Sequence, residues 1–330
     1  MSRFASVIGL AATALLILAG CSKPAGSGAP GGGGEVLKVA SQMGSTRAVM
    51  EASGVLEGAP YKVEWSEFAA ASPLLEALSA NAVDVGGVGD APFIFAYAAG
   101  APIKAVMGYQ TGVRGNSTAV VASAASGIRT VAQLKGRKVA TIKGSIGHFV
   151  LLRLLERAGV SPNDVQIVFL DPGAARAALQ SGSIDAWATW SPYIGLATLH
   201  DSAHVVADGQ GVLDGVGFFA ASNQAIAAKP RILSDFLARL ARAQAWAASH
   251  NDAYGDVLAK DTGLPLDVAR DAAKRLVGHV VPLDAQLARK EYSTLETFRR
   301  AGVIQATPNI DGAFAPQLSQ AALAAAPPAP

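Results

Sequence analysis

The chain has 330 residues, of which 51% are hydrophobic and 16% are charged, and its 27 Lys and Arg nearly balance its 25 Asp and Glu. This composition excludes a disordered chain, and the balanced charge without Lys/Arg clusters argues against a nucleic-acid-binding protein. The single cysteine excludes an intrachain disulfide, a CxxC motif and a thiolate zinc site. The length predicts about two domains.

Residues 1–20 are predicted to be a lipoprotein signal peptide. Arg3 precedes an uncharged apolar stretch from Val7 to Ala19, which is too short to span a membrane. The stretch ends in Leu18-Ala19-Gly20-Cys21, which resembles the lipobox of bacterial lipoproteins. We therefore expect Cys21 to be lipidated rather than to be an ordinary buried or surface thiol, because two or more acyl chains give stable anchoring.

Residues 21–35 are rich in Gly, Ser and Pro, which predicts a flexible tether. Ser22 and Lys23 follow the cysteine without an adjacent Asp, a pattern that favours outer-membrane sorting of bacterial lipoproteins. We expect a periplasmic protein that is anchored to the membrane by lipid and becomes globular at about Val36.

The globular part opens with predicted strands that alternate with predicted helices. The expected strands of this first unit are 36–40, 61–65, 84–87 and 103–107. The expected helices are 46–53, 72–80 and one that begins in Gly89-Asp90-Ala91-Pro92. Strands and helices joined by short Gly-rich turns indicate an α/β fold with a mostly parallel sheet.

The same alternation then starts again in a second unit. Its expected strands are 118–122, 138–142, 165–170, 185–190, 204–207 and 217–221. Its expected helices are a short one from Thr130 with a Thr/Gln capping box, 146–158, 174–180 and one from Ser191. The duplication is architectural, since the two units share no sequence repeat.

Helical patterns follow at 231–249, 252–260, 265–277 and 284–300. We expect them to pack back onto the first unit, which makes that domain discontinuous. The predicted first lobe is 36–115 plus 223–320 and the second lobe is 116–222. The Ala/Pro-rich tail at 321–330 is predicted to be disordered.

Two α/β lobes create a cleft at the carboxyl ends of their strands, which is where such folds bind ligands. Three predicted helix starts face this cleft: Gly44-Ser45-Thr46, Gly144-Ser145 and Trp190-Ser191. A helix start offers unpaired N–H groups and a positive dipole end, so it can hold an anion. For any single serine, ordinary capping is the better interpretation, whereas several aimed at one cleft favour anion binding.

Each of the other candidate ligand-binding residues has two possible roles. Trp190 and Tyr193 either wall an apolar ligand tail or pack in the core. Asp90 caps a helix or accepts a bond from a ligand amine. His148, in the first turn of its helix, is expected to be neutral and either donates to an anion or caps.

Enzyme chemistry finds little support. Ser145 and His148 have no evident acidic partner, the G-x-S-x-G and P-loop motifs are absent, and no G-x-G-x-x-G motif follows a predicted strand. His200 and His204 are separated by a predicted loop, which disfavours a metal site. Cys21 belongs to the predicted anchor. We therefore predict no catalytic residue, no metal, no cofactor and no enzymatic activity.

Several segments between about Val36 and Ile310 resemble those of a known family and follow one another in the same order as in that family. These segments are Trp65-Ser66-Glu67-Phe68, Leu74-Leu75-Glu76-Ala77-Leu78, Gly89-Asp90-Ala91-Pro92, Leu134-Lys135-Gly136-Arg137-Lys138-Val139, Lys143-Gly144-Ser145 with His148, Ala174-Ala175-Arg176-Ala177-Ala178 and Asp185-Ala186-Trp187-Ala188-Thr189-Trp190. The chain resembles the periplasmic substrate-binding proteins of ABC importers in the aliphatic sulfonate, taurine and nitrate family, and most of all the alkanesulfonate-binding branch.

The resemblance implies a type II periplasmic-binding-protein fold, with mixed sheets of parallel type in each lobe and closure about hinges near 112–118 and 220–225. It implies an ABC permease and ATPase complex as partners of a monomer. Together with the helix starts, it gives these expected ligand-binding residues: Ser41, Gln42, Gly89, Asp90, Ser117, Gly144, Ser145, His148, Trp190 and Tyr193.

Two departures from the family pattern concern the ligand. The family's Trp-Asp-Pro-Tyr is Trp190-Ser191-Pro192-Tyr193 here, which removes a carboxylate. The family's Tyr-Gln followed by a basic residue is Ser41-Gln42-Met43, with Arg47 a turn later. We expect a small organic anion, an aliphatic sulfonate first. The alternatives are nitrate, taurine or a pyrimidine or aromatic acid on the same fold, and an enzyme of the thiamine-pyrimidine synthesis type, which export disfavours.

Overall fold

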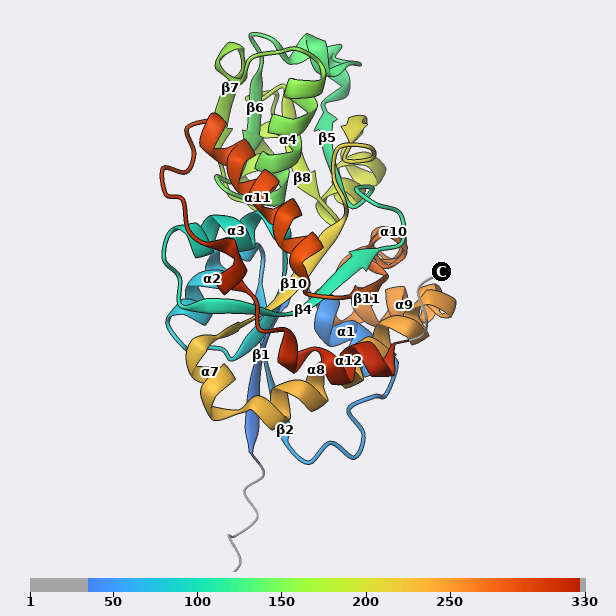
Figure 1. Ribbon diagram of the computed structural model, residues 1–330. Helices are drawn as coiled ribbons and strands as arrows, with labels where there is room; N and C mark the ends of the chain where they lie inside the picture. Colours follow the sequence, from blue (N-terminus) through green and yellow to red (C-terminus); the bar gives the residue numbers. More distant parts are fainter. Residues whose placement is uncertain (1–34, 327–330) are drawn as a thin grey trace, which may run out of the picture. The chain divides into compact units, whose positions relative to one another are not determined.

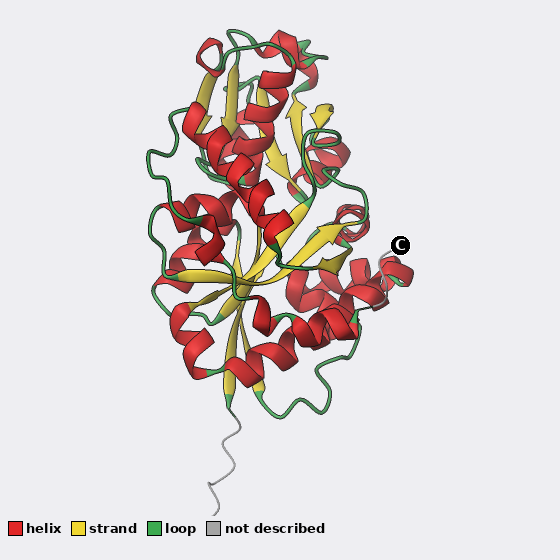
Figure 2. Ribbon diagram, viewed as in Figure 1, coloured by secondary structure: helices red, strands yellow, loops and turns green. Residues whose placement is uncertain are grey.

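The computed structural model describes residues 35–326 (Figure 1). The predicted signal peptide, Cys21 and nearly all of the predicted tether lie outside the described residues. Within them, helices and strands alternate along most of the chain, as the sequence predicts (Figure 2). None of the helices between residues 35 and 326 is long and apolar enough to cross a membrane.

The strands form two sheets. Sheet A has the order β11-β4-β10-β3-β1-β2. Its strands are β1 (Val36–Gln42), β2 (Lys62–Phe68), β3 (Val85–Gly89), β4 (Ile103–Thr111), β10 (Val216–Ser222) and β11 (Gly278–Val281). Sheet B has the order β7-β6-β8-β5-β9. Its strands are β5 (Thr118–Ala122), β6 (Lys138–Thr141), β7 (Gln166–Phe169), β8 (Ala186–Trp190) and β9 (His204–Asp208).

The two sheets repeat one topology. In sheet A, β2, β1 and β3 run parallel and β10 adds antiparallel to β3. In sheet B, β7, β6 and β8 run parallel and β5 adds antiparallel to β8. Both sheets are therefore mixed, and the mostly parallel sheet read from the alternation is limited to three strands of each. We call sheet A with its helices the first lobe, and sheet B with its helices the second lobe.

The chain crosses between the sheets at 112–117 and again at 209–215, and the two crossings are hydrogen-bonded to each other. The Gly209 N–H donates to the Gly115 carbonyl at 3.0 Å, and the Thr111 N–H donates to the Gly215 carbonyl at 3.0 Å. The strand expected at 217–221 forms as β10, but it lies in sheet A rather than in the second unit. The prediction of a second hinge at 220–225 was therefore wrong, because those residues end a central strand of sheet A and start α7.

Helices cover both lobes. Those of the first lobe are α1 (Ser45–Ala52), α2 (Ala71–Ser79), α3 (Asp90–Ala98), α7 (Asn223–Ala228), α8 (Pro230–Ser249), α9 (Asn251–Thr262), α10 (Leu266–Leu276), α11 (Ala285–Arg300) and α12 (Gln320–Ala325). Those of the second lobe are α4 (Ile146–Arg157), α5 (Pro172–Gln180), α6 (Tyr193–Gly195) and the π-helical turn Leu196–His200. Short 3₁₀ turns lie at 124–126, 131–134, 162–164, 310–313 and 316–318.

The C-terminal helices return to sheet A as the sequence predicts. In α8, Leu233, Phe236, Leu237 and Leu240 recur at helical spacing and are fully buried against the sheet. The predicted disorder from residue 321 was wrong for residues 321–325, because α12 packs on α8 and Ala322 is fully buried. Alanine has the highest helix propensity, so a small apolar tail forms a helix once it has a surface to cover.

Helix α11 contacts both lobes, lying along α3 of the first and α4 of the second (Figure 1). Its Phe298 is fully buried, with its ring centroid 6.0 Å from that of Phe95 and 5.6 Å from that of Phe149. Nearby, Arg300 pairs with Glu156 of α4 at 3.0 Å. This helix therefore adds a packed connection beside the two chain crossings.

Candidate binding site

A cavity of about 130 Å³ lies between the lobes, at the carboxyl ends of the strands. It receives the starts of α1, α3 and α4 and the turn after β8. Six of the ten residues predicted to bind the ligand line it: Gln42, Gly89, Asp90, Ser117, Ser145 and Trp190. Ser41, Gly144, His148 and Tyr193 do not line it.

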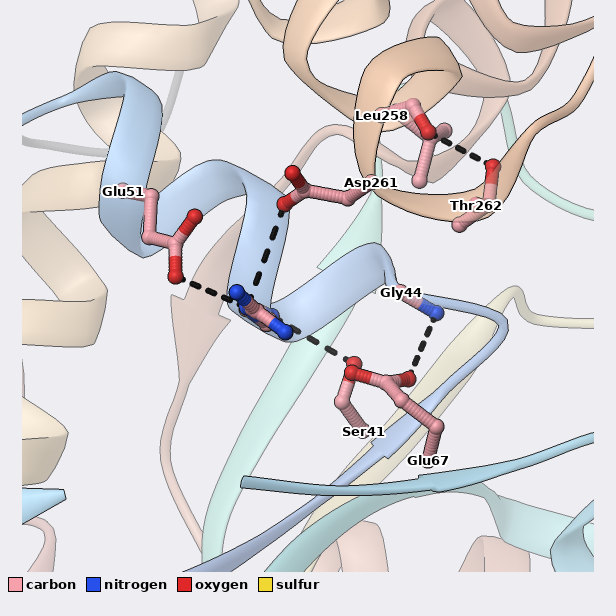
Figure 3. A network of polar contacts seen from close by, with 8 residues as sticks. Ser41, Gly44, Glu51, Glu67, Leu258, Asp261 and Thr262 are labelled. Atoms are coloured by element: carbon pink, nitrogen blue, oxygen red, sulfur yellow. Dashed lines mark hydrogen bonds and ion pairs between the residues drawn. The ribbon is translucent and has the colours of Figure 1, made fainter. Parts of the chain in front are cut away.

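Ser41 supports helix α1 instead of facing the cavity. Its Oγ accepts the Arg47 N–H at 3.4 Å beneath the first turn of the helix, where Figure 3 places it beside Glu67. The Glu67 carboxylate accepts the Gly44 N–H at 3.0 Å. Arg47 itself pairs with Glu51 at 2.7 Å and lies 4.0 Å from Asp261. The basic residue near this loop therefore supplies no charge to the cavity wall.

His148 is a buried capping residue. Its Nδ1 accepts the Gly144 N–H at 3.2 Å and its own N–H donates to Ser145 Oγ at 3.1 Å. Its ring lies 5.3 Å from Phe169 and 5.8 Å from Phe298, measured between centroids. Burial, helped by the charge of Lys143, lowers the pKa of His148 to about 4. The imidazole is therefore neutral at pH 7, as its position in the first turn predicts.

Gly144 has a positive φ of 74°, and a Cβ there would collide with the ring of Phe95 in the first lobe. The turn before α4 thus requires glycine for its backbone conformation and for close approach between the lobes. Gly144 shapes the cavity from behind its wall rather than lining it.

Tyr193 lies behind Trp190, with the two rings edge to face at a centroid distance of 5.8 Å. Its hydroxyl donates to the Ala69 carbonyl at 2.9 Å and contacts Met43 Sδ at 3.2 Å. Both partners belong to the first lobe. Tyr193 therefore connects the lobes, whereas the sequence left open whether it walls a ligand tail or packs in the core.

The cavity is rich in hydrogen-bond donors. The N–H groups of Ser45, Thr46 and Ile146 belong to first turns of helices, where no intrahelical acceptor exists, and all three residues line the cavity. The positive ends of α1 and α4 therefore point toward it.

Two further donors are buried without a partner among the described residues, the Trp190 indole Nε1 and the Ser191 hydroxyl. Trp190 is 7% exposed and Ser191 is 4% exposed, and both line the cavity. Buried polar groups are nearly always hydrogen-bonded, so these two leave unmet hydrogen-bonding capacity beside the cavity. Ser191 was not among the predicted ligand residues. Its position in the sequence, where the family has an aspartate, could have indicated it.

Asp90 is the one charged side chain among the described residues that line the cavity. It is 7% exposed, and its Oδ1 accepts the Ala91 N–H at 2.6 Å. Burial raises the pKa of Asp90 to about 7, with Asp214 adding repulsion. Among the described residues that line the cavity, neutral hydrogen-bond donors and helix ends are therefore available to an anion, and no cationic side chain is.

The apolar part of the cavity lining was not predicted. Its side chains come from β4, β10, α9 and α10: Tyr109, Phe219, Tyr254, Leu258 and Leu276. Tyr109 lies over Gly217, where any Cβ would overlap the phenol ring. A ligand with an ionised group and an apolar group matches this mixed lining.

No catalytic arrangement emerges from the described residues. The His148 ring accepts from Gly144, not from Ser145, so the two side chains do not form a nucleophile–base pair. His200 faces Asp267 at 3.1 Å, while His204 lies 2.6 Å from the Ile128 carbonyl. Within residues 35–326, no group of three His, Cys, Asp or Glu is arranged to hold a metal ion.

Comparison with known proteins agrees with this geometry. Residues 61–253 match the family described as NMT1/THI5 like. A protein of Escherichia coli (strain K12) named for binding aliphatic sulfonates is 36% identical over 271 residues, covering 80% of this chain and 83% of that protein. The solved alkanesulfonate-binding protein SsuA from Xanthomonas axonopodis pv. citri, bound to MOPS, is 32% identical. It superposes with a TM-score of 0.78, covering 85% of this chain and 98% of that chain.

The periplasmic aliphatic sulphonate binding protein SsuA from Escherichia coli is also similar. It shares 33% identity and a TM-score of 0.75 over 85% of this chain and 92% of that chain.

Proposed function

The chain belongs to the NMT1/THI5-like family and, within it, to the aliphatic sulfonate-binding proteins, and from this premise we propose how its cavity works. It is the substrate-binding protein of an ABC importer. It captures a small organic sulfonate between its lobes and releases it chemically unchanged to the permease.

The observation that carries this proposal is the pair of buried, unpartnered donors at Trp190 and Ser191 beside the starts of α1 and α4. A sulfonate is a singly charged anion with three acceptor oxygens. Donors fixed by the fold can replace its hydration without a cationic side chain, because helix ends stabilise negative charge. The apolar wall around Tyr109 and Phe219 then covers the alkyl part.

Release of an unchanged ligand distinguishes this role from catalysis. The relatives compared above are named as binding proteins. Ser145 and His148, the two residues that the sequence offers as a nucleophile and a base, are used for capping. The protein acts as a receptor, without turnover.

The lobes close about the crossings at 112–117 and 209–215, since these two segments carry the chain between the sheets. We assign residues 36–111 and 216–326 to the first lobe and 118–208 to the second. The closed lobes present the surface that the permease and its ATPase complex recognise.

The relatives are periplasmic binding proteins, and we place this chain in the periplasm as a monomer. A lipid on Cys21 would hold it at the membrane, the outer membrane being favoured by Ser22 and Lys23. Metabolic labelling with a fatty acid tests the anchor, since Cys21→Ser should lose the label.

Ligand titration of the purified protein tests the function, in buffers that are not themselves sulfonates. Short alkanesulfonates should bind and stabilise the fold, by about 2.7 kcal/mol at a hundredfold excess over Kd. Trp190→Phe keeps the ring but loses the donor, and should weaken binding about tenfold or more, as expected for a buried hydrogen bond to a charged group. Trp246→Phe, on a ring that stacks on His250 away from the cavity, is the matched control.

Other outcomes would redirect the proposal. Preference for nitrate, taurine or a pyrimidine or aromatic acid would retain the fold and change the ligand. Chemical conversion of any of these compounds would make the protein an enzyme. Unchanged affinity in Trp190→Phe and in Ser191→Ala would contradict the site.

A further inference from the structure

A second cavity, of about 450 Å³, lies on the other side of Asp90. Helices α4 and α11 and the segment 211–216 line it. Asp90, Leu213 and Val216 line both cavities, so these three residues separate the proposed sulfonate site from this second space.

A second buried acid faces the same space. Glu291 of α11 is 1% exposed, and its Oε2 has no hydrogen-bond partner among the described residues. An ionised carboxylate in this position would be compensated only by the nearby Lys290 and the Thr294 side chain, and a buried charge without a close ionic partner is costly. The two carboxyl groups, Asp90 and Glu291, repel each other across the cavity.

The neighbouring charges do not neutralise the pair. Lys290 is paired with Asp214 at 3.3 Å, and Arg153 is paired with Glu156 at 2.7 Å. Arg114 lies exposed at the rim. The ionisable groups around the pair, from β4, α4, α11 and the two crossings, are Tyr109, Arg114, Arg153, Asp214 and Lys290.

Burial is the main cause of the pKa shift of each acid. Burial, with repulsion from Asp214, raises the pKa of Asp90 to about 7, and burial, with repulsion from Asp90 and Asp214, raises the pKa of Glu291 well above its usual range. Two interacting carboxyl groups titrate as a pair, and the pair holds a proton near neutral pH.

We propose that Asp90, supported by Glu291, is a specificity-determining residue; this inference rests on the proposed function. Asp90 allows a singly charged oxyanion to bind by taking up one proton when the ligand enters. Protonated Asp90 no longer repels the ligand and becomes a further hydrogen-bond donor. A doubly charged oxyanion such as sulfate would leave one charge uncompensated, because the described wall provides no cationic side chain. The second cavity gives the proton a route to Asp90 after the ligand has filled the first.

Calorimetric titration of the purified protein with ethanesulfonate tests this inference. The titration is run at pH 8 in two buffers that are neither sulfonates nor phosphates and that differ in ionisation enthalpy. The apparent binding enthalpy should differ between the buffers, corresponding to uptake of about one proton, and the difference should fade at pH 6. Above pH 7 the Kd should rise by up to about tenfold per pH unit. Sulfate should bind far more weakly than ethanesulfonate.

Asp90→Asn should bind ethanesulfonate without proton uptake and with a Kd that is flat between pH 6 and pH 8. Glu296→Gln, on the same helix as Glu291 but paired with Arg299 at 2.8 Å, is the matched control and should keep the proton uptake. The two-buffer measurement on the unaltered protein decides the matter even if Asp90→Asn does not fold.

Tight ethanesulfonate binding with equal enthalpies in both buffers would overturn the inference and leave the proposed function intact. Taurine differs from ethanesulfonate by an added ammonium group. If taurine bound more tightly and without proton uptake, Asp90 would be an ionised partner for a ligand amine, which also overturns the inference. Failure of every alkanesulfonate to bind would instead contradict the proposed function.

Discussion

The hydroxyl of Tyr193 in the second lobe donates a 2.9 Å hydrogen bond to the backbone carbonyl of Ala69 in the first. The bond crosses beside the ligand cavity, behind Trp190. It connects the two lobes independently of the chain crossings at 112–117 and 209–215, and it gives Tyr193 a role in closure.

Tyr193→Phe removes this bond and keeps the ring that packs against Trp190. We expect the Kd for an alkanesulfonate to rise about threefold to tenfold, mainly through faster dissociation, because one hydrogen bond contributes about 0.5–1.5 kcal/mol. Stopped-flow dissociation measures this. Tyr61→Phe breaks a comparable 2.9 Å bond to Asp235 within the first lobe and should leave dissociation unchanged. Equal effects of both substitutions would contradict a lobe-connecting role.

Phe298→Ala should lower the free energy of unfolding by about 3–5 kcal/mol in urea titrations, because it empties a buried site. Its ring joins α11 to Phe95 of α3 and Phe149 of α4. Phe169→Ala, at a ring that is 49% exposed, provides the comparison and should cost about 0.5 kcal/mol or less. Similar losses for the two substitutions would show that α11 contributes little to holding the lobes together.

His148 should make the protein less stable in acid. The pKa of His148 is lowered to about 4, below its usual value of about 6.5, so the unfolded chain binds a proton in this range and the native state does not. The free energy of unfolding should therefore fall as pH drops from about 6.5 to about 4. His148→Asn keeps an acceptor for the Gly144 N–H and should flatten this slope in urea titrations. An unchanged slope would mean that folding does not lower the pKa of His148.

Asp90 should act in the opposite direction. Its native pKa is raised to about 7 from 3.8, so the native state holds a proton that the unfolded chain has already lost. Its contribution to stability falls as pH rises from about 4 to about 7. Asp90→Asn should thus gain stability relative to the natural protein across that window and keep a constant advantage above it. Thermal unfolding at pH 4.5 and pH 8 measures the difference, and a gain that shrinks with rising pH would refute it.

Much of the site could be predicted from local sequence. Gly89 and Trp190 end strands, Ser145 caps the start of a helix and Ser117 lies directly before β5, and the strand directions bring these positions to one edge of each sheet. The four predicted residues that miss the cavity are also at these ends. Spacing along the chain places a residue at an edge, but it does not say whether its side chain caps a helix, as Ser41 does, or meets the other lobe, as Tyr193 does.

Periodicity by itself determined the alternating α/β elements and the amphipathic C-terminal helices, because buried faces repeat every 2 or 3.6 residues whatever their partners. Only the tertiary structure decided which sheet takes residues 216–222, which apolar side chains wall the cavity, and that Asp90 and Glu291 share one buried environment. These depend on contacts between residues as much as about 200 positions apart, and hydrogen-bond pairing and desolvation are set by such neighbours rather than by the local pattern.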